Sequence, residues 1–182
     1  LLVSVEKQYI DGKGGLFKLD PRYRGDSAVV WYQPAEDTSY YSWEGGIIGT
    51  AGINDRYLGE GQDPMAVFTA LDGYTYLVRH PSVRKDTLVY GPDGHTRFHP
   101  PELLCKIPTG PGIASPVITQ NRIIIPGYDG LFLYSYTPAG EVELLDHFGV
   151  PFEASPILWG KRLYIAGRDG FLYCLGENEI SN

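Results

Sequence analysis

The 182-residue chain has only two cysteines and one methionine, and no long run of apolar residues. Cys105 and Cys174 form neither an adjacent pair nor a Cys-x-x-Cys-His haem attachment site. No apolar stretch approaches the roughly 18–20 residues that span a bilayer, so the sequence predicts no membrane-spanning segment. Cations are also scarce, because 15 Lys and Arg stand against 22 Asp and Glu, for a net charge of −7. This balance argues against nucleic acid or an anionic membrane as a partner, since phosphate binding needs clustered cations.

Long stretches of helix-forming residues are absent too, whereas turn formers and aromatic residues are abundant. The chain has 23 glycines and 14 prolines, together with 14 tyrosines, 7 phenylalanines and 3 tryptophans. This composition indicates many short strands separated by tight turns, and therefore an all-β protein. The first residue is Leu1 and not Met, so either a leader has been removed or the chain is part of a longer polypeptide. We favour the second, for a reason that the repeats supply.

Two segments of the chain repeat each other closely. Residues 114–134 read ASPVITQNRIIIPGYDGLFLY, and residues 154–173 read ASPILWGKRLYIAGRDGFLY. The shared residues are 40 positions apart up to an Asp-Gly pair, after which the earlier copy has one additional residue. Weaker copies occupy 66–78 and 8–19, the latter with Gly-Gly in place of Asp-Gly. Such repeats are typical of arrays in which each unit packs on the next.

Each copy contains a hairpin signal, in which a tight turn joins an apolar strand to an aromatic-rich strand. Asp-Gly is a strong signal of this kind, because the turn needs the positive φ that glycine adopts without penalty. With its further turns, one repeat predicts four short antiparallel strands in about 40 residues. We assign the turn aspartates a structural role, since their side chains satisfy nearby backbone donors. The predicted turn residues are Gly15, Asp72, Gly73, Asp129, Gly130, Asp169 and Gly170.

The repeat resembles the pyrroloquinoline-quinone-like β-propeller repeat. In that pattern a strand, a Gly-x-Asp-Gly turn and an aromatic-rich strand are followed by a later Gly and an apolar strand that ends in Trp. The first half is matched best at 115–134 and 155–173, and the second half at 15–31, where Asp20, Gly25 and Trp31 have the family's spacing. The resemblance implies a β-propeller of four-stranded antiparallel blades, with Trp31 docked between two blades, in an extracytoplasmic protein.

The chain is predicted to hold an incomplete propeller of about four partial blades. The blade-like units lie at approximately 1–40, 41–95, 111–149 and 150–178, with insertion loops at approximately 54–64 and 79–110. The first unit lacks a recognisable innermost strand, and the last lacks an outermost one. Four partial blades fall short of the roughly six to eight that this family closes into a ring, and open sheet edges invite aggregation. We therefore expect the missing blades to come from the remainder of the same polypeptide or from other protein chains.

No catalytic, cofactor-binding or metal-binding residue is predicted. Quinone enzymes of this family hold Ca²⁺ with acidic and amide side chains, and none of the turn aspartates matches their metal-bound catalytic aspartate. His95-x-x-x-His99 with Glu102 has the residue types of a zinc site, but two following prolines disfavour the helix that would align the imidazoles. We interpret this motif as an exposed loop. Cys105 and Cys174 either pair or stay free, and we expect a buried thiol at Cys174.

Two regions are candidates for binding. The innermost strands and loops of a propeller line a channel, so 42–51, 112–115 and 152–155 are expected to point toward its axis. The side chains with most binding chemistry there are Trp43, Glu44 and Glu153. The second insertion is locally basic in an acidic chain, and it would complement an acidic partner. Its basic residues are Arg79, His80, Arg84, Lys85 and Arg97.

These features favour a non-catalytic propeller segment that acts as a scaffold and holds other proteins together. One alternative is a fragment of a quinone-dependent dehydrogenase whose catalytic residues lie outside this chain. Another is a propeller that binds carbohydrate or another small ligand. The aromatic content fits this second alternative, but no specific motif in the sequence supports it.

Overall fold

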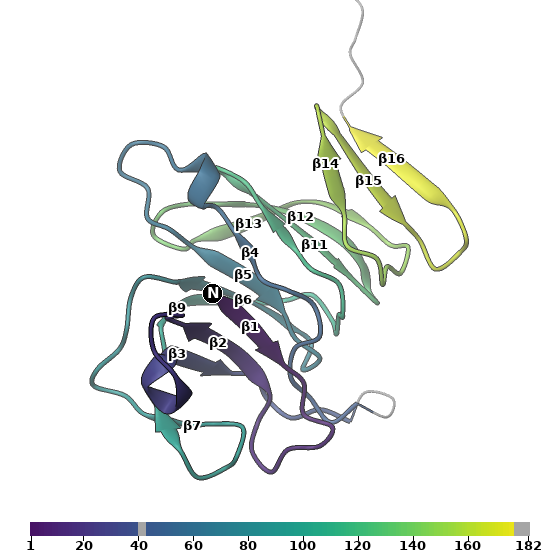
Figure 1. The fold of residues 1–182 in the computed structure, drawn as a ribbon. Coiled ribbons are helices and arrows are strands. Elements are labelled where there is room, and N and C mark those ends of the chain that lie inside the picture. Colours follow the sequence, from purple (N-terminus) through teal and green to yellow (C-terminus); the bar gives the residue numbers. More distant parts are fainter. Residues whose placement is uncertain (40–42, 177–182) are drawn as a thin grey trace, which may run out of the picture.

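The computed structural model describes residues 1–39 and 43–176 of the chain. Its strands form four antiparallel sheets that follow one another in chain order and pack face to face (Figure 1). One small hairpin and two short 3-10 helices are the other regular elements described. The prediction of an all-β fold is confirmed. The ends of the units predicted at 1–40, 41–95 and 150–178 fall partly outside the described residues.

Each sheet is built from strands that are neighbours along the chain. The first sheet contains β1 (Leu2–Val5), β2 (Gly15–Leu19) and β3 (Val29–Pro34). The second contains β4 (Gly52–Ile53), β5 (Ala66–Thr69), β6 (Tyr74–Arg79) and β9 (Glu102–Pro108). The third contains β10 (Val117–Ile118), β11 (Arg122–Gly127), β12 (Gly130–Tyr136) and β13 (Val142–Phe148). The fourth contains β14 (Ile157–Trp159), β15 (Arg162–Ala166) and β16 (Leu172–Gly176).

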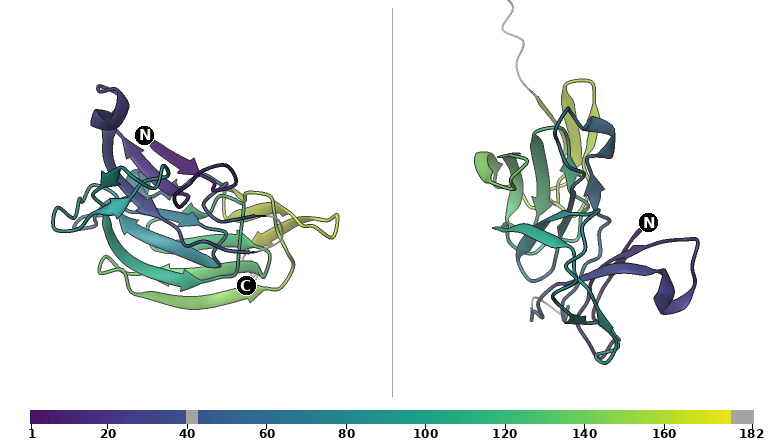
Figure 2. Two further views of the ribbon diagram at one scale, coloured as in Figure 1. Left: turned by 90° about the horizontal axis from the view of Figure 1, so that it is seen from below. Right: turned by 90° about the vertical axis from the view of Figure 1, so that its left-hand side faces the viewer.

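The remaining elements lie in the connections. Helix η1 (Gly25–Ala28) precedes β3, and η2 (Asp55–Tyr57) follows β4. Strands β7 (Val89–Tyr90) and β8 (Arg97–Phe98) form the small hairpin between β6 and β9. The first and fourth sheets lie at opposite ends of the array (Figure 2). Each of these two sheets therefore forms one end of the array.

The Asp-Gly pairs lie at the turns between the second and third strands of the last three sheets. Asp72 accepts the N–H of Tyr74 at 3.0 Å, and Asp169 accepts the N–H of Phe171 at 3.2 Å. In the third sheet the turn is tighter, because Gly127 pairs directly with Gly130, which begins β12. The additional residue of that repeat therefore lengthens the strand. The glycines with positive φ after these aspartates are Gly73, Gly130 and Gly170.

The core consists of three apolar clusters, one between each pair of successive sheets. Trp31 of β3 is fully buried in the first cluster with Phe68 and Tyr76 of the second sheet. Its indole N–H donates to the carbonyl of His80 at 2.8 Å. Burial of large aromatic side chains between sheets is a main source of stability in such a stack.

The predicted turn at Gly15 is wrong, because Gly15 begins β2. It pairs with Val5 of β1 on one side and Pro34 of β3 on the other. The strand that precedes β2 is Leu2–Val5, not the segment 8–12, and residues 6–14 form a long connection between the two strands. The physical reason is that 8–12 has an exposed Tyr9 and no alternation that could bury one face of a strand.

The predicted boundaries of the second insertion also need correction. β9 lies inside the range 79–110 that the sequence assigned to a loop, and it pairs with β6 as the outermost strand of the second sheet. The inserted segment is therefore 80–101. It carries the β7–β8 hairpin and separates two strands that are neighbours in space.

Candidate interaction surface on the fourth sheet

The second and third sheets each bury an apolar row against the sheet that follows. Side chains paired in register across a sheet share one face. In the second sheet Val67 pairs with Leu77, and both are fully buried. In the third sheet Ile124 pairs with Leu133 and Val117, and the three pack in the cluster shared with the fourth sheet. Ile124 is 9% exposed.

The fourth sheet has the equivalent row, and there it faces solvent. Ile157, Tyr164 and Cys174 are paired in register, and Leu172 lies on the same face as Cys174. Ile157 is 65% exposed and Leu172 74%, and Trp159 on the same face of β14 is 78% exposed. In the part of the chain that the structure describes, no element covers this apolar face.

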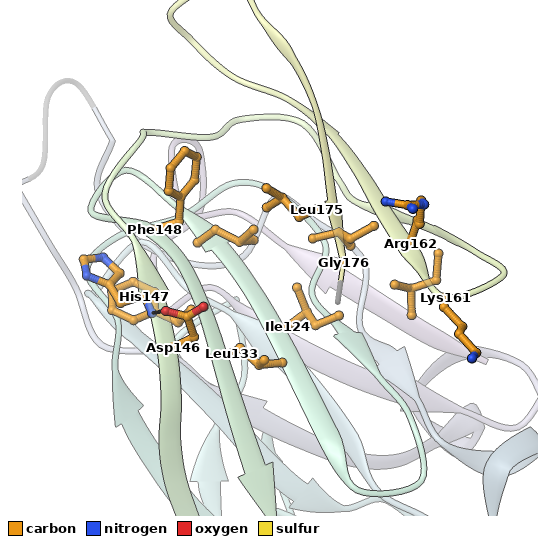
Figure 3. A pocket seen from close by; sticks show the side chains of 13 residues that line it. Ile124, Leu133, Asp146, His147, Phe148, Lys161, Arg162, Leu175 and Gly176 are labelled. Atoms are coloured by element: carbon orange, nitrogen blue, oxygen red, sulfur yellow. Dashed lines mark hydrogen bonds between the residues drawn. The ribbon is translucent and has the colours of Figure 1, made fainter. Parts of the chain in front are cut away.

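A groove of about 670 Å³ opens between the third and fourth sheets (Figure 3). Phe148 and His147 of β13 line one side, and Leu175 of β16 and Arg162 of β15 line the other. The second and third sheets have a fourth strand beyond their third one, whereas the described part of the fourth sheet ends at β16. The groove lies between the facing sides of the two sheets, and Leu158, Leu163 and Leu175, which are paired in register, form its wall on the fourth sheet.

Side-chain hydrogen bonds between the innermost segments recur with the repeat. The backbone N–H of Thr50 donates to the hydroxyl of Ser115 at 2.9 Å. The N–H of Ser115 donates in turn to the hydroxyl of Ser155, also at 2.9 Å. All three residues lie in the segments that the sequence assigned to the channel axis. The structure thus brings these segments together in chain order.

Backbone hydrogen bonds follow the same period. The N–H of Gly112 donates to the carbonyl of Ala70 at 3.4 Å, and the N–H of Phe152, 40 residues later, donates to the carbonyl of Gly127 at 2.9 Å. Each bond ties the connection that enters a sheet to the hairpin turn of the sheet before it. In the fourth sheet, the carbonyl at the position equivalent to Ala70 and Gly127 is that of Gly167.

The side chains predicted at the channel do not form one site. Glu153 accepts from the Tyr128 hydroxyl at 2.9 Å and lies 3.4 Å from the guanidinium of Arg168, so it joins turns of the third and fourth sheets. Trp43 is half-buried and Glu44 is exposed, and no hydrogen bond among the described residues links either side chain to Glu153. Residue 42, at the start of the predicted segment 42–51, lies outside the described residues.

The basic residues of the second insertion are mostly paired within the chain. Their carboxylate partners are Asp63 and Glu102 for Arg79, Asp55 for His80 and Asp86 for Arg84. Arg97 stacks over the ring of Tyr90 at 4.8 Å, and Lys85 is exposed. The structure therefore does not gather the five residues into one cationic cluster.

The histidine motif of the same insertion has contacts of its own. Nδ1 of His99 lies 2.8 Å from the carbonyl oxygen of Thr87 and 3.1 Å from that of Arg84. The Glu102 carboxylate accepts from Arg79 at 2.8 Å. No group of three His, Cys, Asp or Glu side chains that could hold a metal ion is found within residues 1–39 and 43–176.

Both cysteines are free thiols. Cys105 is half-buried in β9, and burial raises the pKa of its thiol to about 11. Cys174 is exposed, so the prediction of a buried thiol there is wrong. The reason is that Cys174 lies on the outward face of β16, which no sheet within residues 1–39 and 43–176 covers.

Sequence reasoning did not single out the exposed row of the fourth sheet. A signal was present, because 171–175 reads Phe-Leu-Tyr-Cys-Leu and is apolar at successive positions. Strands that are buried on both faces have such continuous apolar runs, whereas strands with one wet face alternate. The run therefore indicates that both faces of the fourth sheet are built for burial.

No protein-family model and no curated protein sequence matches the chain. Among solved structures, the chain is similar to BamB from Moraxella catarrhalis, with a TM-score of 0.53 at 15% sequence identity. BamB is a β-propeller protein. This chain has a β-propeller repeat fold. The match covers 97% of this chain and 48% of the BamB chain, so the chain spans about half the length of this neighbour. No helix in the described ranges is long and apolar enough to cross a bilayer.

Proposed function

We propose that the chain is a non-catalytic segment of a β-propeller scaffold, and that a further sheet of the same repeat packs on its fourth sheet. The observation that carries this proposal is the exposure of Ile157 and Leu172, which occupy the apolar row that earlier sheets bury. Full burial of one such side chain contributes about 1.5–3 kcal/mol. A contiguous apolar face of this kind marks an interaction surface.

The free edge of β16 supports the same proposal. An unpaired strand edge presents a row of N–H and C=O groups that pair readily with another strand. In the third sheet β13 pairs with β12 in this way. A fourth strand on β16 would complete the last blade, as β13 completes the third sheet. The remainder of a longer polypeptide or a partner chain would supply both this strand and the next sheet.

We also propose an extracytoplasmic location, which is supported by the resemblance of the repeat to a family with such members. The dehydrogenase fragment and the propeller that binds carbohydrate or another small ligand are not favoured by any specific contact among the described residues.

Cys174 is a native probe of the proposed surface. In the isolated 182-residue chain we expect its exposed thiol to react readily with iodoacetamide, while the half-buried Cys105 reacts slowly at pH 8. In the native protein, purified with everything that stays attached to it, we expect Cys174 to react at least tenfold more slowly. Equal labelling of Cys174 in the two preparations would contradict the proposal.

A charge introduced on the outward face of the fourth sheet also tests whether another element covers this face, and the chain offers a matched control. Leu172→Asp places a carboxylate where an apolar contact is expected, and burying an unpaired charge is strongly unfavourable. We expect this variant to raise Cys174 labelling in the native protein at least tenfold. Leu145→Asp changes a leucine of β13 that is 43% exposed and not part of this face, so labelling should stay unchanged. A similar effect from both variants would count against the surface.

A further inference from the structure

Each sheet after the first buries the apolar row that faces the sheet before it. In the second sheet Phe68 pairs with Tyr76, and both are buried in the cluster shared with the first sheet. In the third sheet Ile123 pairs with Tyr134, and both pack in the cluster shared with the second sheet. The fourth sheet buries Leu163 against the third in the same way. A covered row on this side is therefore a regular feature of the array.

The first sheet has the same row, and it is only partly covered. Val3, Phe17 and Tyr32 are paired in register across β1, β2 and β3. They point away from the second sheet, because Trp31 next to Tyr32 packs in the cluster shared with that sheet. Val3 and Phe17 are half-buried, whereas Tyr32 is fully buried. The coverage of this far face thus increases toward β3.

The segment 80–101 of the second sheet supplies that coverage. Its His99 carbonyl accepts the backbone N–H of Tyr32 at 3.0 Å, on the outer edge of β3. The Phe98 ring of β8 lies 5.5 Å from the ring of Phe17 and 6.2 Å from that of Tyr32. Figure 1 shows β7 beyond β3, on the side away from β5 and β6. The β7–β8 hairpin therefore extends the row by one aromatic side chain, which is itself half-buried.

The position of Phe98 suits the gap between two radial blades. Sheets that are arranged radially diverge with distance from the axis, so the outer part of each gap needs larger side chains to reach close packing. Between the first and second sheets, Trp31 of β3 fills this place, and its indole N–H donates to the His80 carbonyl at 2.8 Å. Phe98 lies beside the same strand on the opposite face of the first sheet. The hairpin therefore fills the outer part of a second gap, on the far side of the first sheet.

We propose that the far face of the first sheet, together with Phe98, is the docking surface for the blade that closes the propeller ring. This inference rests on the proposed scaffold and names a second surface through which that scaffold is completed. A ring of blades leaves no sheet at an end, so its last blade lies against its first. The occupant is a sheet of the same repeat that presents an apolar outward row, as Ile157 and Leu172 do in the fourth sheet. The segment 80–101 then joins three blades, because it leaves the second, covers the edge of the first and contacts the closing one.

A thiol on the far face of the first sheet tests this surface. Val3→Cys places the probe in the half-buried row, next to Phe17 in register. We expect Cys at position 3 to react with iodoacetamide at least tenfold more slowly in the native protein than in the isolated 182-residue chain. Protection of Cys174 with equal labelling of position 3 in the two preparations would overturn the docking surface and leave the scaffold standing. Equal labelling at both positions would overturn the scaffold as well.

The role of the hairpin is tested by two probes on its opposite faces. Phe98 pairs with Val89 and faces the first sheet, so Tyr90, which follows Val89, faces away and is 54% exposed. We expect Phe98→Cys to be labelled at least fivefold more slowly in the native protein than in the isolated chain, and Tyr90→Cys to differ less than twofold. Slow exchange of the Tyr32 amide shows that the hairpin stays in place in each variant, since this N–H is bonded to His99. Equal protection of the two probes would overturn the contact between the hairpin and the closing blade.

A photo-crosslink identifies the occupant. Benzophenone maleimide attached to Val3→Cys, in a Cys174→Ser background, reaches the element that lies on the far face of the first sheet. In the native protein we expect the cross-linked peptide to carry the repeat pattern of an apolar strand, an Asp-Gly turn and an aromatic-rich strand. A cross-link to a peptide without this pattern would overturn the closing blade as the occupant.

Discussion

The backbone N–H of Ser115 donates to the hydroxyl of Ser155 at 2.9 Å, and the two residues occupy the same place in successive repeats. The same bond occurs one repeat earlier, where the N–H of Thr50 donates to the hydroxyl of Ser115. Each hydroxyl therefore accepts from the repeat that precedes it. This arrangement links the innermost segments in one direction along the array, and a next repeat would offer its own Ser or Thr to the N–H of Ser155.

We predict that Ser115→Ala weakens the array by removing the acceptor of the Thr50 N–H. A net loss of about 0.5–1.5 kcal/mol is expected for one neutral hydrogen bond in a partly solvated position. The free energy of unfolding in urea measures this loss. Ser27→Ala is the control, because Ser27 is exposed in η1. If the two variants have equal stability, the bond between repeats contributes nothing measurable.

Trp31 and Trp159 offer a second matched comparison. Trp31 is fully buried and its indole donates to the His80 carbonyl, whereas Trp159 is 78% exposed. Trp31→Phe should lower the free energy of unfolding by about 2 kcal/mol, through the lost hydrogen bond and the space left by the smaller ring. Trp159→Phe in the isolated chain should change it by less than about 0.5 kcal/mol. Equal losses would contradict the docking of Trp31 between the first two sheets.

Replacement of the turn glycine by alanine is predicted to destabilise the protein more in the third sheet than in the fourth. A Cβ at Gly130 would lie 2.5 Å from His147 Nε2 and 2.6 Å from the Phe148 carbonyl oxygen, whereas a Cβ at Gly170 meets nothing within 4 Å. Both glycines have positive φ. Gly170→Ala should therefore cost only the backbone strain of about 1–2 kcal/mol, and Gly130→Ala about 3 kcal/mol or more. Urea unfolding of both variants checks the order, and a larger loss for Gly170→Ala would contradict it.

The third and fourth sheets could be predicted from the sequence because their signals are local. The Asp-Gly pairs at 129–130 and 169–170 mark hairpins, and the flanking apolar segments are short enough to be strands only. The offset of 40 residues then makes the two sheets equivalent. The same reasoning located the second sheet from its Asp-Gly pair at 72–73.

Pairings across long connections could not be predicted in this way. β1 joins β2 across residues 6–14, and β6 joins β9 across residues 80–101. Neither connection joins its two strands by a tight turn, so the sequence near the partner strand contains no sign of the pairing. The position of β9 depends on packing between whole sheets, and the spacing of apolar residues along the sequence does not reveal that packing.

The candidate surface was missed for a different reason. The apolar character of 171–175 was visible, but whether Cys174 is buried depends on which element covers the outward face of β16. In the described residues no element does so, and the thiol is exposed. The contact of Phe98 with Phe17 and Tyr32 is likewise a property of the folded chain, because these residues are far apart in sequence.

The turn of the β7–β8 hairpin is predicted to depend on pH through Asp93. Bonds from the Thr96 hydroxyl and from the N–H groups of His95 and Thr96 hold the pKa of Asp93 at about 2, below its ordinary 3.8. Because the folded-state pKa is depressed, the stabilisation is present above about pH 4 and is lost as pH falls through about 2. The Asp93 carboxyl resonance should titrate near 2, and Thr96 amide exchange should rise over the same interval. Asp93→Asn should abolish this pH dependence, and a titration midpoint at 3.8 would contradict the turn's hydrogen bonding.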